Sequence, residues 1–250
     1  MNDVRRRMLA SLERDGYVFA SAAEAAASLQ LDLTGLDALA GSWNALPRDA
    51  YLRDGGAYRA RRHSCFIQED AGRPQLVAHR PHWQPTSYNA LHGGLTRWFE
   101  PVDTAVLQAA AWGQLVGSLG ALFAQLRAVP RWFIEAHQFR IDTASGIGRP
   151  TPEGAHRDGV DFVAVVLVSR HHVIGGETRV FAAHGSSGVR FTMAQPWAML
   201  LMDDARVIHE TTPLQSEDAG GASGSELGVR DTLVLTYRAR GFQEPETGEG

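Results

Sequence analysis

The chain has 250 residues, enough for one large domain with a substantial buried core. Its hydrophobic fraction of 44% and charged fraction of 21% are ordinary for a globular protein, and its net charge of −4 argues against a nucleic-acid-binding surface. The single cysteine, Cys65, excludes an internal disulfide and a cysteine-based zinc site. No apolar stretch is long enough for a signal peptide or a membrane span, so we expect a cytoplasmic protein without a membrane partner.

The N-terminal end of the sequence predicts short helices. Ser21 is a candidate cap of the second of them, and residues 36–43 form a third helical pattern. Residues 51–68 alternate enough to predict a strand, and loops rich in Pro, His and aromatic residues follow it. In residues 104–128, leucines recur at helical spacing, so this segment predicts the best helix of the chain.

From Arg131 onward, the pattern changes to short β-prone runs separated by Gly, Pro and Ser. These runs are Phe133–Ile141, Gly159–Ser169, Thr178–Ala182, Ala198–Leu201 and Thr232–Arg238. A helical front part (about 1–130) followed by strands (about 131–243) predicts a mainly β, α+β fold. We expect a double-stranded β-helix, or jelly-roll, core with N-terminal and central helices packed against it. Residues 1–243 would form this single domain, and residues 244–250 a flexible tail.

A His-x-Asp pair, His156 and Asp158, precedes an apolar run, and His209 follows about fifty residues later. Two imidazoles and one carboxylate form the three-point cap of a mononuclear non-haem Fe(II) site, which leaves positions open for oxygen and a co-substrate. Residues i and i+2 of a strand project from the same face, so we expect His156 and Asp158 to bind one ion from a strand edge. His209 would reach the same ion from a second strand.

Further segments occur in a fixed order around these residues. They are Tyr58–Arg62, Tyr88–Asn89, Glu135–Arg140, Pro152–Phe162, Gly175–Thr178, Asp203–His209 and Arg230–Tyr237. Together they resemble the bacterial 2-oxoglutarate/Fe(II)-dependent dioxygenases that include free amino-acid hydroxylases of the L-isoleucine 4-hydroxylase type. The resemblance covers roughly residues 45–240. One departure is the stretch between His209 and Arg230, which is longer and richer in Gly and Ser than expected.

The resemblance implies an enzyme that uses Fe(II), 2-oxoglutarate and O2 to hydroxylate an aliphatic C–H bond of a free L-amino acid or a close derivative. Succinate and CO2 would be released. His156, Asp158 and His209 would bind the iron and carry catalysis. The partners implied are a small amino-acid-like substrate, no nucleic acid and no membrane.

The resemblance also implies a cation for the C5 carboxylate of 2-oxoglutarate. Arg230 lies where such enzymes place it, and a guanidinium suits the task because it binds a carboxylate through two hydrogen bonds and keeps its charge. Arg238, with the same strand parity, is the alternative. Thr178, Thr236 and Gln138 are further candidates for contacts with 2-oxoglutarate.

A zwitterionic substrate needs both a cation and an acceptor in the pocket. Candidate substrate-binding residues are Arg59, Arg61, Tyr88, Asn89 and Arg140, with Glu69, Asp70 or Glu135 as acceptors of the ammonium group. Among the histidines of the loop-rich front half, His63, His79, His82 and His92, we expect one or two to line the pocket.

Other interpretations were weighed. A His-x-Asp pair that stands alone is most often structural, but His209 and Arg230 favour the metal site here. A protein kinase is excluded because Val163 stands where the kinase Asn is expected, and a serine hydrolase because the sequence has no Gly-x-Ser-x-Gly elbow. Two alternatives stay open: a related hydroxylase acting on a peptide or carrier-bound residue, and a non-catalytic metal-binding jelly roll that acts as a sensor.

The segment Gln215–Gly228 is rich in Gly, Ser, Ala and acidic residues and offers little to bury. Because it joins the segment of His209 to the strand of Arg230, we expect a mobile lid that orders when substrate closes the site.

Overall fold

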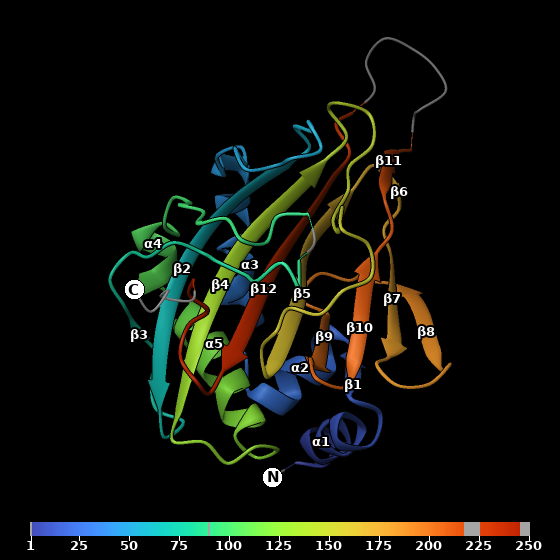
Figure 1. Ribbon diagram of the computed structural model, residues 1–250. Helices are drawn as coiled ribbons and strands as arrows, with labels where there is room; N and C mark the ends of the chain where they lie inside the picture. Colours follow the sequence, from blue (N-terminus) through green and yellow to red (C-terminus); the bar gives the residue numbers. More distant parts are fainter. Residues whose placement is uncertain (1, 90, 218–225, 246–250) are drawn as a thin grey trace, which may run out of the picture.

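The computed structural model describes residues 2–89, 91–217 and 226–245. Helices cover one face of a large antiparallel sheet, and two small sheets and long loops lie over the other face (Figure 1). The predicted mainly β jelly-roll core with helical support is confirmed. In the part of the chain described, no helix has both the length and the apolar character needed to cross a membrane.

The helices come from the front part of the chain. Those described are α1 (Asp3–Asp15), α2 (Ala22–Leu29), α3 (Leu33–Asp37), the 3-10 helix η1 (Ala40–Ala45), α4 (Thr104–Gln108) and α5 (Ala110–Phe123). Ser21 caps α2 as predicted: its hydroxyl accepts a hydrogen bond from the Glu24 backbone N–H, and the Glu24 carboxylate accepts one from the Ser21 N–H. The predicted helix 104–128 is divided at Ala109, where an extended backbone (ψ 133°) separates α4 from α5.

The main sheet draws strands from both halves of the chain. Within the described residues it comprises β1 (Tyr17–Ala20), β2 (Arg59–Glu69), β3 (Gln75–Leu76), β4 (Arg131–Asp142), β5 (Phe162–His171), β9 (Met199–Asp203) and β12 (Val229–Arg238). The spatial order is β1-β9-β5-β12-β4-β2-β3. The strands β1 and β2 therefore place parts of the helical front region inside the same sheet as the later strands.

Two smaller antiparallel sheets face the main sheet. One contains β10 (Val207–Thr211), β7 (Glu177–Ala182) and β8 (Gly188–Thr192), in that order, and the other pairs β11 (Leu214–Ser216) with β6 (Val173–Gly175). All five β-prone runs expected from the sequence correspond to strands: β4, β5, β7, β9 and β12.

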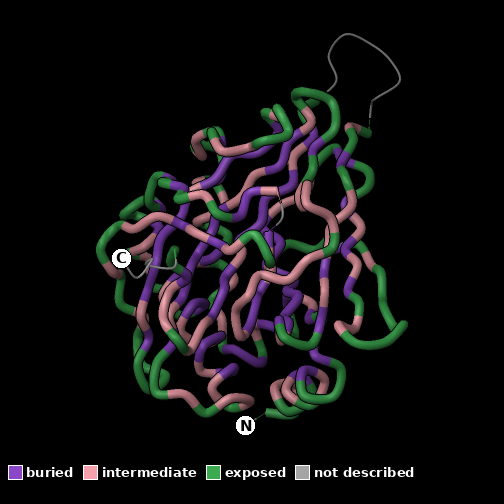
Figure 2. The backbone as a smooth tube through the Cα atoms, in the orientation of Figure 1, coloured by how far each residue is buried: buried purple, intermediate pink, exposed green. Residues whose placement is uncertain are grey.

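Alternation along the central strands separates an apolar face from a polar face. Ile134 and Ala136 of β4, with Leu233 and Leu235 of β12, pack against the helices in the larger core. The intervening residues of both strands point into a cavity on the opposite face, where polar side chains predominate: Glu135, His137, Phe139 and Ile141 from β4, and Arg230, Thr232, Val234 and Thr236 from β12. Figure 2 shows buried residues concentrated along these central strands.

A second, smaller core ties the small sheet to one edge of the main sheet. Val163 and Leu167 of β5 pack there with Val180 of β7 and Val207 of β10. This contact fixes β10, and with it His209, opposite the polar face of the main sheet. The cavity thus lies between these two sheets.

Candidate active site

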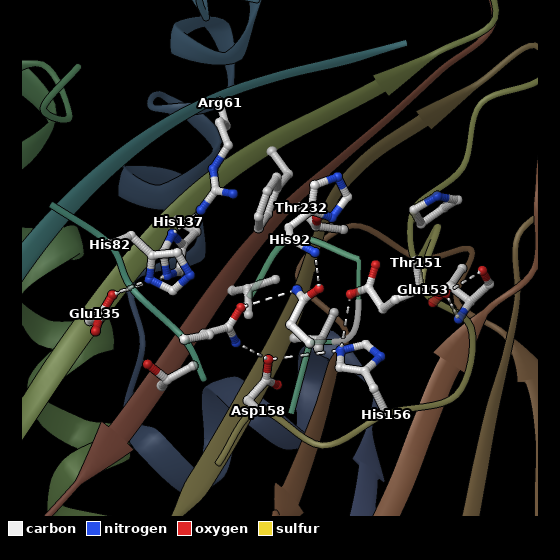
Figure 3. A pocket seen from close by; sticks show the side chains of 18 of the residues that line it. Arg61, His82, His92, Glu135, His137, Thr151, Glu153, His156, Asp158 and Thr232 are labelled. Carbon is white, nitrogen blue, oxygen red and sulfur yellow. Dashed lines mark hydrogen bonds and ion pairs between the residues drawn. The ribbon is translucent and has the colours of Figure 1, made fainter. Parts of the chain in front are cut away.

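The structure brings His156, Asp158 and His209 together at one end of this cavity. Figure 3 shows His156 and Asp158 there. Nε2 of His209 lies 3.3 Å from Oδ2 of Asp158, and Nε2 of His156 lies 3.8 Å from Oδ1 of Asp158. One ligand atom of each residue lies within 4.8 Å of the others. Two ligands bound at right angles about 2 Å from one ion are about 3 Å apart, so small side-chain shifts suffice to seat an ion. This donor set suits Fe(II) with open positions.

The backbone that carries the triad differs from the expected strand edge. His156 and Asp158 lie in an extended segment before β5 rather than in a regular strand. A single bridge pairs His156 with His209 of β10, and the backbone N–H of each donates to the carbonyl of the other at 3.0 Å. The distance between the two histidines is therefore set by this tertiary pairing as well as by the sequence spacing.

A buried carboxylate, Asp204, holds the turn that follows Asp158. Its Oδ1 accepts a hydrogen bond from the Asp158 N–H at 2.9 Å, and its Oδ2 accepts from the N–H groups of Gly159 and Val160 at 2.8 and 3.1 Å. Gly159 has φ +76°, and a Cβ at this position would lie 2.5 Å from the ring of Tyr88. Only glycine fits this turn without strain.

Hydrogen bonding determines which nitrogen of His156 faces the site. Its Nδ1 donates to the carbonyl of Gly154 at 2.9 Å, which leaves the lone pair of Nε2 toward Asp158. Burial alone would lower the pKa of His156, but the carboxylates of Asp158 and Glu153 raise it above its ordinary value. Burial would raise the pKa of Asp158, but contacts with His209 and His156 lower it to about 2. A charged carboxylate between two imidazoles favours a cation.

Arg230 enters the same cavity from β12 and is only 3% exposed. Its Nε and Nη2 are buried without a hydrogen-bond partner in the described part of the chain. Burial and the neighbouring Arg170 lower the pKa of Arg230 to about 10, so it stays charged at neutral pH. Buried, unpaired guanidinium donors are unfavourable unless an anion binds them. Their position on the triad's cavity fits the distal carboxylate of 2-oxoglutarate.

Several other predicted residues also reach the cavity. Arg59, Arg61, Asn89 and Thr236 line it. Tyr88 lies beside it, in a neighbouring depression. Of the four histidines considered in the front half, His82 and His92 line the cavity, as expected for one or two of them.

Gln138 and Arg140 do not reach the cavity. Both occupy β4 positions that face the helices, because they alternate with the cavity-lining residues of that strand. The Nε2 of Gln138 donates to Oγ of Ser42, and Arg140 makes two 2.7 Å hydrogen bonds with Asp231. The structure therefore removes Gln138 from the 2-oxoglutarate contacts and Arg140 from the substrate contacts.

Arg238 and Thr178 also lie outside the cavity lining. Arg238 shares the strand parity of Arg230, but eight residues of strand separate them by about 26 Å. Its guanidinium donates to the carbonyl of Gly241. Thr178 is buried opposite Thr211 on β7, with its hydroxyl unpaired among the described residues. Of the two arginines, only Arg230 lines the cavity that contains the triad.

The sequence did not single out several residues that line the cavity. They are Gln84 and Arg97 of the covering loop, His137 of β4, Glu153 and Gln243. His137 shares its strand parity with Glu135, so alternation along β4 could have identified it. The loop residues carry no periodic signal. The central part of the expected lid, residues 218–225, lies outside the described residues; Gln215 belongs to β11, and the Gly228 N–H donates to Thr143.

Comparisons with known proteins show a matching family and similar solved structures. Residues 40–236 match the model of a family described as 2OG-Fe dioxygenase. The crystal structure of a BsmA homolog from Methylobium petroleophilum is similar over 96% of this chain and 95% of that chain, with 52% sequence identity and a TM-score of 0.90. The comparison with curated proteins gave no match.

More distant solved structures share the fold. IDO from Bacillus thuringiensis is 18% identical over 96% of this chain and 97% of that chain, with a TM-score of 0.75. TqaL, an Fe(II)/α-ketoglutarate-dependent dioxygenase, is 16% identical over 95% of this chain and 90% of that chain, with a TM-score of 0.66.

Proposed function

The chain belongs to the 2OG-Fe dioxygenase family, and on that premise we propose that it hydroxylates an aliphatic C–H bond of a free L-amino acid or a close derivative. Enzymes of this family use Fe(II), 2-oxoglutarate and O2. Membership identifies the chain as an enzyme, so the non-catalytic alternative is not retained. A cytoplasmic location remains part of this proposal.

The observation that carries the residue assignment is the unpaired, buried guanidinium of Arg230 on the cavity that also contains the triad. In this proposal, His156, Asp158 and His209 hold the iron, and Arg230 binds the C5 carboxylate of 2-oxoglutarate through two charge-assisted hydrogen bonds. A metal-binding protein without oxygenase activity has no need of this second group. The bound iron and 2-oxoglutarate supply the oxidising chemistry.

In this proposal the protein positions the metal ligands and the substrate and limits the access of water to the cavity. The Gly154 carbonyl and the Asp204 carboxylate keep two of the ligands in place before the metal binds, which limits the reorganisation needed on binding. The cavity walls restrict water and orient one substrate C–H bond relative to the metal. Gln84 contributes to this order because its Nε2 donates to Oδ1 of Asp158 at 3.3 Å, while its Oε1 accepts from Arg97.

The charge of the cavity supports a substrate without net charge. Among the described lining residues, the arginines are Arg59, Arg61, Arg97 and Arg230, and the carboxylates are Glu135, Glu153 and Asp158. Asp49 supplies a fourth carboxylate, 2.8 Å from Arg59. Fe(II) and the two carboxylates of 2-oxoglutarate cancel each other. The remaining space therefore suits a zwitterion, which places both charges on oppositely charged protein groups.

A succinate-release screen tests this function. The iron-loaded enzyme is incubated with 2-oxoglutarate, ascorbate and each of the twenty protein L-amino acids, with the N-acetyl amino acids and short peptides as parallel series. We expect succinate above the uncoupled background, together with a product heavier by one oxygen atom, with at least one free amino acid. Turnover of N-acylated or peptide substrates, with none of the free amino acids, contradicts the proposal and favours the peptide-directed alternative.

A further inference from the structure

A second group of histidines surrounds Glu135 in the same cavity, on the side of the main sheet (Figure 3). Nε2 of His63 and Nδ1 of His82 lie 2.9 and 2.7 Å from Oε2 of Glu135, and Nε2 of His137 lies 3.7 Å from the same oxygen. Glu135, His82 and His137 line the cavity, whereas His63 is fully buried behind them. The group has the composition of a metal site.

Its geometry instead favours a hydrogen-bonded carboxylate. The rings of His63 and His137 are stacked, with centroids 4.6 Å apart and an interplanar angle of 18°. A metal ion lies in the plane of each imidazole that binds it, and two nearly parallel planes offset in this way do not meet at one ion beside Glu135. Nη2 of Arg61 also lies 2.6 Å from Nδ1 of His137. The guanidinium of Arg61 therefore already supplies a positive charge next to this group, where a metal ion would otherwise supply it.

The arginine determines the direction of the hydrogen bonds. Because Arg61 can only donate, Nδ1 of His137 must accept, and its Nε2 then carries the proton toward Glu135. His82 donates through Nδ1, so its Nε2 is an acceptor. Burial would raise the pKa of Glu135, but the contacts with His82 and His63 hold it well below its usual range. The result is a charged carboxylate with a neutral imidazole beside it.

Two hydrogen-bond acceptors of the Glu135 group have no partner among the contacts described above and are available to a ligand. All the contacts above go to Oε2 of Glu135, so Oε1 is left over, and the side chain keeps 10% exposure in a residue that lines the cavity. Nε2 of His82 is the second acceptor. On the other side of the His137 ring, Arg61 is held between the faces of Phe99 and Phe139, at 3.8 and 4.4 Å from the ring centroids. A cation and an anion are thus separated by one imidazole.

We propose that Arg61 and the Glu135–His82 pair form the head-group site of the substrate: Arg61 binds an α-carboxylate, and Glu135 with His82 binds an unsubstituted α-ammonium group. This inference rests on the proposed function and narrows it. The two charged groups of an α-amino acid are attached to one carbon, which matches a cation and an anion held one ring apart. An N-acyl group would remove the charge and two of the three N–H donors, so the site selects free amino acids against peptides.

The binding test uses the enzyme loaded with Fe(II) and 2-oxoglutarate without oxygen. It is dialysed to equilibrium against an equimolar mixture of the twenty protein L-amino acids, and retained compounds are quantified by mass spectrometry. Parallel mixtures contain the corresponding 2-hydroxy acids, which lack the ammonium group, and the amino-acid amides, which lack the carboxylate. We expect retention of at least one free amino acid, and about 10- to 100-fold less of its two analogues.

Variants assign each charge to its partner. Glu135→Gln should reduce retention of the amino acid about 10- to 100-fold while sparing the hydroxy acid, which places no positive charge there. Arg61→Met should reduce retention of the amino acid and of the hydroxy acid alike, because both carry the carboxylate, and should leave retention of the amide unchanged. Glu100→Gln is the matched control, because Glu100 is an exposed carboxylate paired with Arg62 and does not line the cavity. Retained 2-oxoglutarate reports that each variant keeps its fold.

Three outcomes overturn the inference. One is unchanged discrimination between amino acid and hydroxy acid in Glu135→Gln, or loss of this discrimination in the control Glu100→Gln. Another is a second metal ion per chain, in addition to the iron of the triad, that disappears in His82→Gln; this ion would identify a metal site at Glu135. The third is retention of no free amino acid by the unaltered enzyme. Free amino-acid turnover in the succinate screen combined with the first or second outcome refutes the head-group site alone. Turnover of acylated substrates only refutes the proposed function as well.

Discussion

The two ends of the cavity use the same residue types for different purposes. At one end, His156, Asp158 and His209 present their ligand atoms to one point, and the other nitrogen of His156 is held by a backbone carbonyl. At the other end, histidines direct N–H groups onto Glu135, and Arg61 supplies the counter-charge. Composition alone does not separate a metal site from a hydrogen-bonded carboxylate. The two are separated by the hydrogen-bond partner of the other imidazole nitrogen, which is an accepting carbonyl for His156 and the donating Arg61 for His137.

The largest expected effect comes from the triad. His209→Ala or Asp158→Ala should weaken iron binding more than about 100-fold, since loss of a hydrogen bond to a ligand already costs 10- to 100-fold. Turnover should fall to background. Iron content after dialysis and succinate release measure both effects, with circular dichroism as the fold control. His63→Ala, at the other end of the cavity, should leave iron content unchanged; a loss of iron there would mean that the two ends are not distinct.

Arg230 is expected to have the next largest effect. Arg230→Lys keeps the charge but loses the two-pronged donor, so the KM for 2-oxoglutarate should rise about 10- to 100-fold, the equivalent of ~1.5–3 kcal/mol for a charged hydrogen bond. The KM for the amino-acid substrate should change much less. Arg238→Lys is the matched control on the same strand, outside the cavity. If the control raises the 2-oxoglutarate KM and Arg230→Lys does not, the assignment of the anchor is wrong.

The third prediction concerns Asp204, whose carboxylate holds the backbone turn that carries the ligand Asp158. Asp204→Asn removes the charge that receives three backbone N–H groups around Asp158, and iron affinity should fall about 10-fold. Asp203→Asn is the adjacent control, because Asp203 accepts only from the nearby Ala205 N–H among these turn residues. Competition with a fluorescent iron chelator gives both affinities. Equal affinities in the two variants would show that the order of the turn does not depend on Asp204.

The smallest expected effect concerns pH at the Glu135 end. Burial lowers the pKa of His82 from 6.5 to about 4, despite the opposing charge of Glu135. The unfolded chain therefore binds more protons than the folded chain below pH 6.5, and folding stability is lost as the pH falls from 6.5 toward 4. His82→Gln should reduce this loss between pH 7 and pH 5 by up to ~2 kcal/mol.

Urea unfolding of the metal-free protein at several pH values measures this effect. The other titratable or charged groups that act on His82 are Glu135, Arg97 and Arg61, and the rings of His63 and His137 lie edge-on beside it. All of these groups remain in the variant. His184→Gln, at an exposed histidine outside the cavity, is the control. An unchanged pH slope in His82→Gln contradicts a neutral, buried His82.

The sequence determined the elements that depend on local pattern. Alternation and turn residues predicted β4, β5, β7, β9 and β12, and the cap at Ser21 predicted the start of α2, because strand and helix periodicity are written in neighbouring residues. The triad was predicted from residue type and spacing, since metal chemistry restricts the side chains that serve, and Arg230 was predicted from the family resemblance.

Only the tertiary structure decided which side chains share the cavity. It separated Arg230 from Arg238, which have equal parity, because Arg230 lines the cavity of the triad whereas Arg238 donates to the carbonyl of Gly241. It moved Gln138 and Arg140 to the helical face, since the register of β4 with β12 fixes which parity points inward. It also joined His82, Glu135 and Arg61 from a loop and two strands. Contacts between segments distant in sequence leave no periodic signal, so the sequence offered Arg61, Glu135 and His82 only as members of larger sets of candidates and did not bring them together.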